Sequence, residues 1–467
     1  MSPKRAQLAL AVLFAINLMN FFDRQIIGAV GEQIRKEWSL SDAALGTLGT
    51  AFTLIYAIVG LPLGRLADTF SRTRIIGIGV CVWSVLTAAS GVCTSFAQLI
   101  VVRLGVGLGE ASCAPAAASL IGDLFPAHKR SNALSVFRLG LPIGIAMSFL
   151  VGGYIAKTYG WQMAFFVAAL PGVLCAVAAV VLMPEPKRGA SEVHDIGAST
   201  REGSPIKLVL SIPSMWPIVA SGALHNFNMY AIGSFIAPLM IRYHKVDIAQ
   251  AGYYSMVVFG FSGIPGLVFG GMLADKLTKR WLGGRMILSA AMFCVAAPLT
   301  YLAVDAGPGN PMGFAIPMAL GVAAMYVYYS TTYSTIQDLV EPSLRGMAMA
   351  TYFCAMYLLG ASLGPVVMGK LSDHYMLAAA AAAGVTDTAG AALEPFKGVG
   401  LRQAMYVIPV LNLALTLCMV AASRTVPRDI EKLRTWMRHA ASGSARPARG
   451  RIAVTGARVS RAGRWSG

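Results

Sequence analysis

Long apolar blocks, each of about twenty residues, recur along the whole length of this chain. Each block is long enough to cross the hydrocarbon core of a membrane, about 30 Å thick, as a helix. Twelve blocks can be counted, and they begin near residues 7, 43, 73, 97, 132, 161, 214, 249, 283, 311, 344 and 399. The charged fraction is only 13%, about half that of a soluble domain. The sequence therefore predicts an all-α polytopic membrane protein with twelve transmembrane helices.

The first block follows Lys4 and Arg5, as the apolar core of a signal peptide would. Asp23 and Arg24, however, stand where the small residues of a cleavage site should be. We therefore interpret this block as a retained first helix.

Lys and Arg are distributed unevenly between the two sides of the predicted helices. With the N-terminus inside, the cytoplasmic segments carry 27 of them and the opposite segments carry 8. This bias places both termini in the cytoplasm, and the frequent Ala and Arg residues favour a bacterial inner membrane. The net charge of +17 is mainly this topology signal. Because the basic residues are spread over loops, a nucleic-acid partner is not expected.

A polar stretch divides the helices into two sets of six. We predict an N-terminal bundle (1–183), a cytoplasmic linker (184–213), a C-terminal bundle (214–423) and a basic cytoplasmic tail (424–467). A second long connection, 373–398, should lie outside. Apolar residues at helical spacing after Pro427 predict a short amphipathic helix on the inner leaflet, where the tail can contact membrane lipids.

The two halves repeat each other at three equivalent places. The repeated pairs are "IGDLF" (121–125) with "IQDLV" (336–340), "GRLADTFSRTR" (64–74) with "GMLADKLTKR" (271–280), and "GLPIG…GG" (140–153) with "GASLGPVVMG" (360–369). The repetition predicts two pseudo-symmetric bundles with a substrate site near the midplane between them.

Four charged residues stand inside the first and fourth predicted helices, and we call them the charge cluster: Asp23, Arg24, Arg103 and Glu110. Unpaired, they would together cost on the order of 10 kcal/mol, at about 2.5–3.5 kcal/mol each. A marginally stable protein cannot tolerate that cost. We therefore expect these charges to be paired, hydrated or functional, and a static ion-pair network is the alternative to a transport role.

The partners within the charge cluster follow from geometry. Neighbouring residues on a helix point about 100° apart, so Asp23 and Arg24 need separate partners. Arg103 and Glu110 share one face of the fourth predicted helix, about 10 Å apart along its axis. Arg103 should lie at the depth of Asp23, with Glu110 nearer the membrane centre. Depth therefore favours Arg103 as the partner of Asp23.

The repeated G-x-L-A-D segment with its following basic residues resembles the signature loop of the major facilitator superfamily, and the resemblance covers residues 7–423. Within that superfamily, "NLMNFFDRQIIGAV", "RLGVGLGEASCAPAAASLIGDLFPAHKRS" and "VFRLGLPIG" resemble the Spinster family. The spacing from Arg103 to Glu110 and the G-E-A-S tetrad are the most specific features. The Asp-Arg pair of the first helix also occurs in organic anion symporters.

The resemblance implies secondary active transport by alternating access, proton-linked, of amphipathic lipids such as lysophospholipids or sphingoid-base phosphates. It also implies a contact between Arg24 and Glu110, which can coexist with the pairing that depth favours. A carboxylate separated from its cation in an apolar environment takes up a proton. We hypothesise that Glu110 or Asp23 carries the proton and that Arg103 or Arg24 binds an anionic substrate group.

The second half lacks these charges, since Met325 stands at the position equivalent to Glu110. It carries "HNFNMY" (225–230) and "YVYYSTTY" (326–333) instead, and amide and phenol groups on an aromatic wall suit an amphipathic ligand. Ordinary helix packing is the alternative. Arg138 either contacts a substrate phosphate or carboxylate or extends towards the cytoplasm. The candidate substrate-binding residues are Arg24, Glu110, Arg138, His225, Asn226, Asn228, Tyr230, Tyr326 and Tyr329.

The signature loops and the helix ends that face them are predicted to form a cytoplasmic gate, which holds the inner side shut in the outward-facing state. Arg72 and Arg74 are expected to pair with Asp123. A role in topology alone is the alternative. The candidate gate residues are Gly64, Asp68, Arg72, Arg74, Asp123, Arg130, Asp275, Lys279, Arg280, Asp338 and Arg345.

Other classes of function have little support. No motif joins a nucleophile to a base, so an enzyme is not expected, and the seven cysteines show neither disulfide nor metal spacing. No phosphate-binding glycine loop is present, and no cofactor is expected. The predicted partners are protons, membrane lipids and an amphipathic or anionic small molecule, bound by a monomer. The runner-up is a proton-coupled symporter of small organic anions such as aromatic or sugar acids.

Overall fold

The computed structural model describes residues 3–186, 204–341, 344–385 and 390–441. These ranges are almost entirely helical and contain no β-strand. The helices are α1 (Pro3–Glu37), α2 (Asp42–Thr69), α3 (Arg72–Ser90), α4 (Phe96–Ala111), α5 (Cys113–Leu124), α6 (Ala127–Tyr159), α7 (Trp161–Leu182), α8 (Pro205–Leu210), α9 (Met215–Arg242), α10 (Ile248–Ser255), η1 (Met256–Phe261), α11 (Gly263–Arg280), α12 (Gly284–Asp305), α13 (Pro311–Asp338), α14 (Arg345–Ala355), η3 (Met356–Ala361), α15 (Leu363–Ala382), α16 (Gly390–Met405) and α17 (Val407–Ala441).

Eleven stretches of the described chain are long and apolar enough to cross a membrane. The twelfth crossing is α9, whose His225 and two asparagines lower its hydropathy although its 28 residues suffice in length. Three crossings are each built from consecutive helices: α4 with α5, α10 through η1 to α11, and α14 through η3 to α15. The twelve-helix architecture predicted from the apolar blocks is therefore confirmed.

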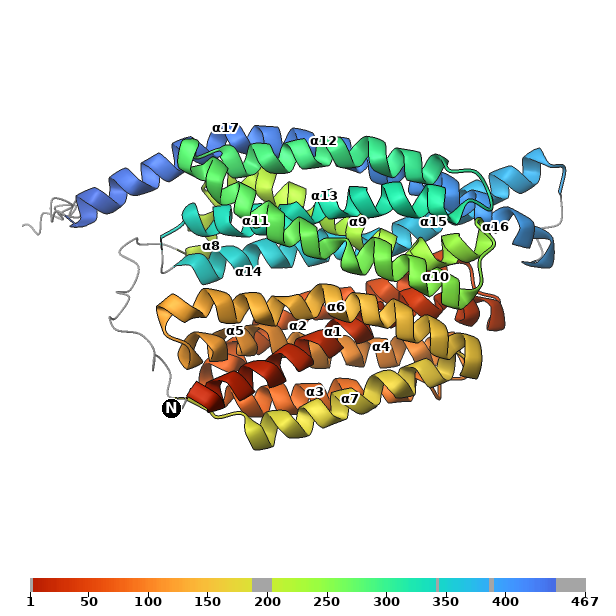
Figure 1. The fold of residues 1–467 in the computed structure, drawn as a ribbon, viewed down its shortest axis with the longest axis horizontal. Helices are drawn as coiled ribbons and strands as arrows, with labels where there is room; N and C mark the ends of the chain where they lie inside the picture. Colours follow the sequence, from red (N-terminus) through yellow and green to blue (C-terminus); the bar gives the residue numbers. More distant parts are fainter. Residues whose placement is uncertain (1–2, 187–203, 342–343, 386–389, 442–467) are drawn as a thin grey trace, which may run out of the picture.

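The helices form two bundles that lie side by side (Figure 1). The N-terminal bundle contains α1 to α7, coloured red to yellow, and the C-terminal bundle contains α9 to α17, coloured green to blue. We call the end of the bundles where α1, α3 and α12 begin the terminal face. The end where α1 finishes and α2 begins is the opposite face.

The second long connection predicted at 373–398 is largely helical in its described residues, because α15 continues to Ala382 and α16 begins at Gly390. The last crossing begins at Val407, eight residues beyond the predicted start at 399. The predicted linker contains α8.

The predicted amphipathic tail helix is the end of α17, which continues unbroken past Pro427 to Ala441. This end projects beyond the bundles at the terminal face (Figure 1). Asp429 fixes its first part, since its carboxylate accepts hydrogen bonds from the backbone N–H and the hydroxyl of Ser214, at 3.0 and 2.6 Å. The extension therefore continues the last membrane-crossing helix.

The two bundles approach each other most closely in the half of the molecule near the opposite face. A Cβ atom added at Gly46 of α2 would lie 2.2 Å from the carbonyl oxygen of Pro365 in α15, and one at Gly28 of α1 would lie 2.2 Å from that of Gly233 in α9. Only glycine allows backbones to come this close. The bundles are thus in direct backbone contact there.

Candidate functional site

Arg24 and Glu110 form a buried ion pair between α1 and α4. The Nη2 atom of Arg24 lies 3.1 Å from Oε2 of Glu110 and donates a second hydrogen bond, also 3.1 Å, to Oδ1 of Asn20. Both charged side chains are almost completely inaccessible. The contact implied by the family resemblance is therefore present, and it compensates two charges that would be costly alone.

Arg24 also joins the two bundles. Its Nη1 atom donates to the hydroxyl of Tyr230 in α9 at 3.2 Å and to that of Tyr357 in η3 at 3.3 Å. On the N-terminal side its guanidinium lies 4.5 Å from the ring centroid of Tyr56, within cation–π range. Tyr56 and Tyr357 were not among the predicted site residues, because neither has a charged neighbour or a motif in sequence that marks it.

Asp23 and Arg103 meet differently from the prediction. Nη2 of Arg103 donates to the backbone carbonyl of Asp23 at 3.3 Å, and the Asp23 carboxylate accepts from the hydroxyl of Thr87 in α3 at 3.4 Å. No ion pair joins the two side chains in the described part of the chain, so the carboxylate pairing favoured by depth is wrong. Because Arg24 points to the bundle interface, its neighbour Asp23 points to α3 instead.

The charge cluster keeps unused hydrogen-bonding capacity. Nε and Nη1 of Arg103, Nε of Arg24, Oδ1 of Asp23 and Oε1 of Glu110 are buried without a hydrogen-bond partner among the described residues. A cavity of about 20 Å³ lies between Arg24 and Arg103, bordered by Thr53, Tyr230 and Ser234. It has room for about one water molecule. The two cations of the charge cluster, Arg24 and Arg103, therefore face a small polar space between the bundles.

Several predicted substrate-binding residues are held by structural hydrogen bonds. Asn226 donates to the carbonyl of Gly222 in its own helix at 3.1 Å. Asn228 donates to Asn412 of α17 at 3.1 Å, and Tyr326 to the carbonyl of Phe259 at 3.2 Å. Asn228 and Tyr326 thus connect helices of the C-terminal bundle, because buried polar groups must find partners. Of the "HNFNMY" segment, Tyr230 reaches the charge cluster.

A row of aromatic rings runs along α13 towards the terminal face. His225 is fully buried against Tyr329, with ring centroids 4.8 Å apart, and Tyr329 contacts Tyr333 at 5.7 Å. Tyr333 contacts Phe353 of α14 at 5.3 Å. Arg138 of α6 is exposed and places its guanidinium 5.8 Å from the Tyr333 centroid. The aromatic row, Tyr329, Tyr333 and Phe353, thus leads from the interior to Arg138 of the other bundle.

The first signature loop forms ion pairs within its own bundle. Arg72 is fully buried at the start of α3 and pairs with Asp123 of α5, as predicted, and with Glu185 at 2.8 Å. Arg74 is exposed. Gly64 and Asp68, two of the predicted gate residues, lie outside the residues whose side chains the structure describes.

In the second signature loop the basic partner is Arg285. It lies 2.5 Å from Asp338 and 3.7 Å from Asp275, whereas the predicted Lys279 and Arg280 are exposed at the end of α11. Counted from the shared G-x-L-A-D motif, α11 runs four residues further than α2, and the connection after it is one residue longer. Arg285, near the start of α12, therefore takes the place that Arg72 has at the start of α3, and the motif alignment pointed to Lys279 instead.

The two remaining gate candidates, Arg130 and Arg345, also lie at the terminal-face ends of their own bundles. Arg345 donates to the carbonyl of Gln337 at 3.2 Å, and Arg130 is half-buried near the start of α6. The ion pairs of Arg72 and those of Arg285 each connect segments of one bundle, and each set therefore stabilises the terminal-face end of its own bundle. In the described residues no group of His, Cys, Asp and Glu is arranged to hold a metal ion.

Two six-helix bundles around a buried charge cluster define a polytopic transporter. A sequence profile described as "Major Facilitator Superfamily" matches residues 13–365, and the chain belongs to this family.

Among known proteins, the chain is 28% identical over 432 residues to an MFS-type efflux pump of Mycolicibacterium smegmatis, covering 92% of this chain and 95% of that one. It is 26% identical to the sphingosine-1-phosphate transporter SPNS2 of Danio rerio, covering 78% and 76%. A solved bacterial homologue of the human lysosomal transporter Spinster, inward-facing and occupied, has a TM-score of 0.80 at 27% identity and covers 92% and 99%. The chain is thus a membrane transporter of the Spinster type and not an enzyme.

Proposed function

We propose that this transporter moves amphipathic lipids with an anionic head group, of the lysophospholipid or sphingoid-phosphate type, by proton-coupled alternating access. The observation that carries the proposal is the position of Arg24. It binds Glu110 in one bundle and two tyrosine hydroxyls in the other. A change at this one guanidinium therefore acts on both bundles.

The head group competes with Glu110 for the same cation. A buried arginine needs one counter-charge, and either the Glu110 carboxylate or a substrate phosphate supplies it. When the phosphate takes Arg24, the carboxylate is left buried without its cation and takes up a proton. Arg103, with two unused N–H groups beside the small cavity, offers a second contact to the anion. Proton and substrate binding are coupled by this exchange.

The apolar body of the substrate has a path of its own. The aromatic row extends from near the charge cluster towards Arg138 and the terminal face. Such a wall suits an acyl or sphingoid chain better than a compact acid. The SPNS2 relative, named for sphingosine-1-phosphate, is consistent with this substrate class.

The sidedness of the conformation follows from the positive-inside rule, which places the terminal face in the cytoplasm. The bundles are in backbone contact near the opposite face, and this supports an inward-facing assignment. The solved Spinster homologue is itself inward-facing. The efflux-pump relative from a bacterium is consistent with a location in a bacterial inner membrane.

Transport in proteoliposomes with an imposed pH gradient tests the proposal. We expect Glu110→Gln to abolish acceleration by the gradient while retaining slow exchange of a fluorescent lysolipid, because the variant cannot change charge. Asp305→Asn, which removes an exposed pair with Arg402, is the control and should transport normally. Full gradient dependence in both Glu110→Gln and Asp23→Asn would refute proton coupling through this cluster.

The substrate class is tested separately by thermal stabilisation of the purified protein. A lysophospholipid and sphingoid-phosphate panel should raise the melting temperature, and the rise should shrink in Arg24→Gln. Stabilisation by aromatic or sugar acids alone would favour the organic-anion symporter instead.

A further inference from the structure

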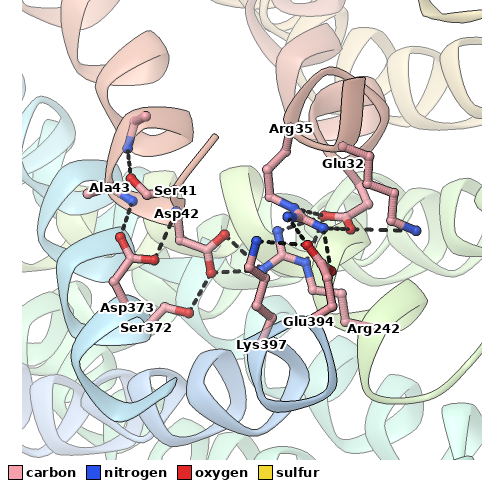
Figure 2. Close-up of polar contacts among 12 residues, drawn as sticks. Glu32, Arg35, Ser41, Asp42, Ala43, Arg242, Ser372, Asp373, Glu394 and Lys397 are labelled. Atoms are coloured by element: carbon pink, nitrogen blue, oxygen red, sulfur yellow. Dashed lines mark hydrogen bonds and ion pairs between the residues drawn. The ribbon is translucent and has the colours of Figure 1, made fainter. Parts of the chain in front are cut away.

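A second set of charges, all buried except Glu394, joins the two bundles at the opposite face (Figure 2). We call this set the opposite-face cluster. Its members are Glu32 and Arg35 of α1, Asp42 at the start of α2, Arg242 at the end of α9, and Glu394 and Lys397 of α16. The set contains three acidic and three basic side chains, so its charges balance.

Arg242 is the centre of the opposite-face cluster. Its Nη1 atom lies 2.8 and 2.7 Å from the two carboxylate oxygens of Asp42, and its Nε atom lies 2.7 Å from Oε2 of Glu32. All three side chains are at least 95% inaccessible. One arginine of the C-terminal bundle is therefore inserted between two carboxylates of the N-terminal bundle.

Further contacts of the cluster also cross this interface. Arg35 makes two hydrogen bonds to Glu394 of α16, at 2.9 and 3.1 Å. Asp373 of α15 accepts from the backbone N–H groups of Asp42 and Ala43, at 3.0 and 2.9 Å, and so caps α2 from the other bundle. Figure 2 shows Asp373 and Arg242 on either side of Asp42. The first turn of α2 is thus held from two sides.

Burial distinguishes the three side chains around Arg242 from a further ion pair between the bundles at the opposite face. Lys157 of α6 pairs with Asp247, which precedes α10, at 3.1 Å, but their side chains are 52% and 42% exposed. An exposed pair contributes about 0–1 kcal/mol. Breaking a buried pair by removing one partner costs about 3–5 kcal/mol, because a charge is left uncompensated.

We propose that the opposite-face cluster is the lock of the transport cycle at this face, with Arg242 as its key residue. When its contacts are intact, it holds the opposite face shut. The face opens when the cluster separates and each charge is hydrated. This inference rests on the proposed alternating access. Glu32 and Asp23 lie on the same unbroken helix, about 13 Å apart along its axis, so movement of the lock displaces the charge cluster as well.

Hydrogen exchange of the whole protein in lipid nanodiscs tests the lock. In Arg242→Gln, Glu32 and Asp42 face each other without their shared cation. We expect exchange to accelerate by more than about tenfold in the first turns of α2 and the last turns of α9, as the closed population falls. Exchange at the terminal-face ends of α3 and α12 should slow, because the two faces open alternately. Loosening of local structure alone would not produce this second change.

Two further variants complete the test. Glu394→Gln removes a partner that is 45% exposed, so it does not endanger folding, and it should shift both faces in the same directions by a smaller factor. Lys157→Gln, the exposed pair, should leave exchange unchanged. Faster exchange at the opposite face without slower exchange at the terminal face would overturn the lock, as would equal effects of Lys157→Gln and Arg242→Gln. Failure of lipid transport would appear in the flux assay and would leave this exchange pattern intact.

Discussion

Glu185, which follows α7 in the sequence, is a single side chain that fixes the start of α3. It accepts from the backbone N–H of Thr73 at 2.9 Å, from Nε of Arg72 at 2.8 Å and from the hydroxyl of Ser71 at 2.8 Å. Burial alone would raise the pKa of this carboxyl group. The Thr73 amide and the Arg72 guanidinium outweigh burial, and they hold the pKa of Glu185 below its ordinary value of 4.5.

A depressed pKa in the folded state gives stability that is present above the unfolded-state pKa and is lost as the pH falls through the folded-state pKa. We therefore expect Glu185→Gln to lower stability by about 1 kcal/mol at neutral pH, the scale of a carboxylate at a helix N-terminus. The difference from wild type should shrink below about pH 4. Thermal unfolding in detergent between acid and neutral pH measures this. Glu431→Gln, an exposed carboxylate on α17, is the control; a deficit that persists at acid pH would contradict the electrostatic origin.

Arg24 shows what sequence can say about one residue and what it cannot. The free-energy cost of a charge inside an apolar helix indicates that Arg24 must be paired. The family resemblance pointed to Glu110, and the structure agrees at 3.1 Å. Tyr230 was a candidate substrate-binding residue, but nothing local identifies it or Tyr357 as a partner of Arg24, since they lie 206 and 333 residues away in sequence. A phenol has no net charge to balance, so its partner emerges only from the packing of the two bundles.

At the scale of the helix, α2 carries two glycines with opposite requirements. A methyl group at Gly46 would meet the Pro365 carbonyl of α15 at 2.2 Å, whereas nothing lies within 4 Å of one at Gly60. Replacing glycine in a helix by alanine gains about 0.5–1 kcal/mol where space allows. Overpacking a backbone contact costs about 1–3 kcal/mol.

We therefore expect Gly46→Ala to lower the melting temperature and to favour separation of α2 from α15, and Gly60→Ala to raise the melting temperature slightly. Thermal unfolding of both variants in the same lipid measures the signs. Hydrogen exchange in the first turns of α2 should accelerate in Gly46→Ala only. A neutral or stabilising Gly46→Ala would mean that the close approach of these helices contributes little.

The helices themselves were largely predictable, because each apolar block has to span the membrane. Charges at helix ends were not. In the topology argument, Arg242 and Arg35 are counted among the basic residues of the outer side. That assignment gave no reason to expect a specific ion-pair partner for either of them. Their inclusion in the opposite-face cluster depends on how two bundles meet. Likewise, Arg285 pairs with Asp338 in place of Lys279 because α11 runs further past its motif than α2 does, and the motif alone does not show where a helix ends.

For the whole molecule, the two halves repeat in sequence but differ in their energetics. The first signature loop pairs a fully buried Arg72 with Asp123, whose side chain is 12% exposed. The second pairs Arg285 with Asp338, and these side chains are 15% and 45% exposed. Solvent screens the second pair and leaves the first unscreened. The repeated motif therefore contributes unequally to stability in the two halves. The stability of the N-terminal bundle depends on its ion pair more than that of the C-terminal bundle does.

Equivalent substitutions in the two halves should therefore have unequal effects. We expect Asp123→Asn to destabilise the protein by about 2–3 kcal/mol, because Arg72 stays buried with only Glu185 to balance it. Asp338→Asn should cost at most about 1 kcal/mol, since water solvates Arg285. The two sites lie in different bundles, so the double variant should show the sum of both effects. Thermal unfolding of the three variants measures this, and equal losses in the two halves would show that burial at the signature loops does not set their contribution.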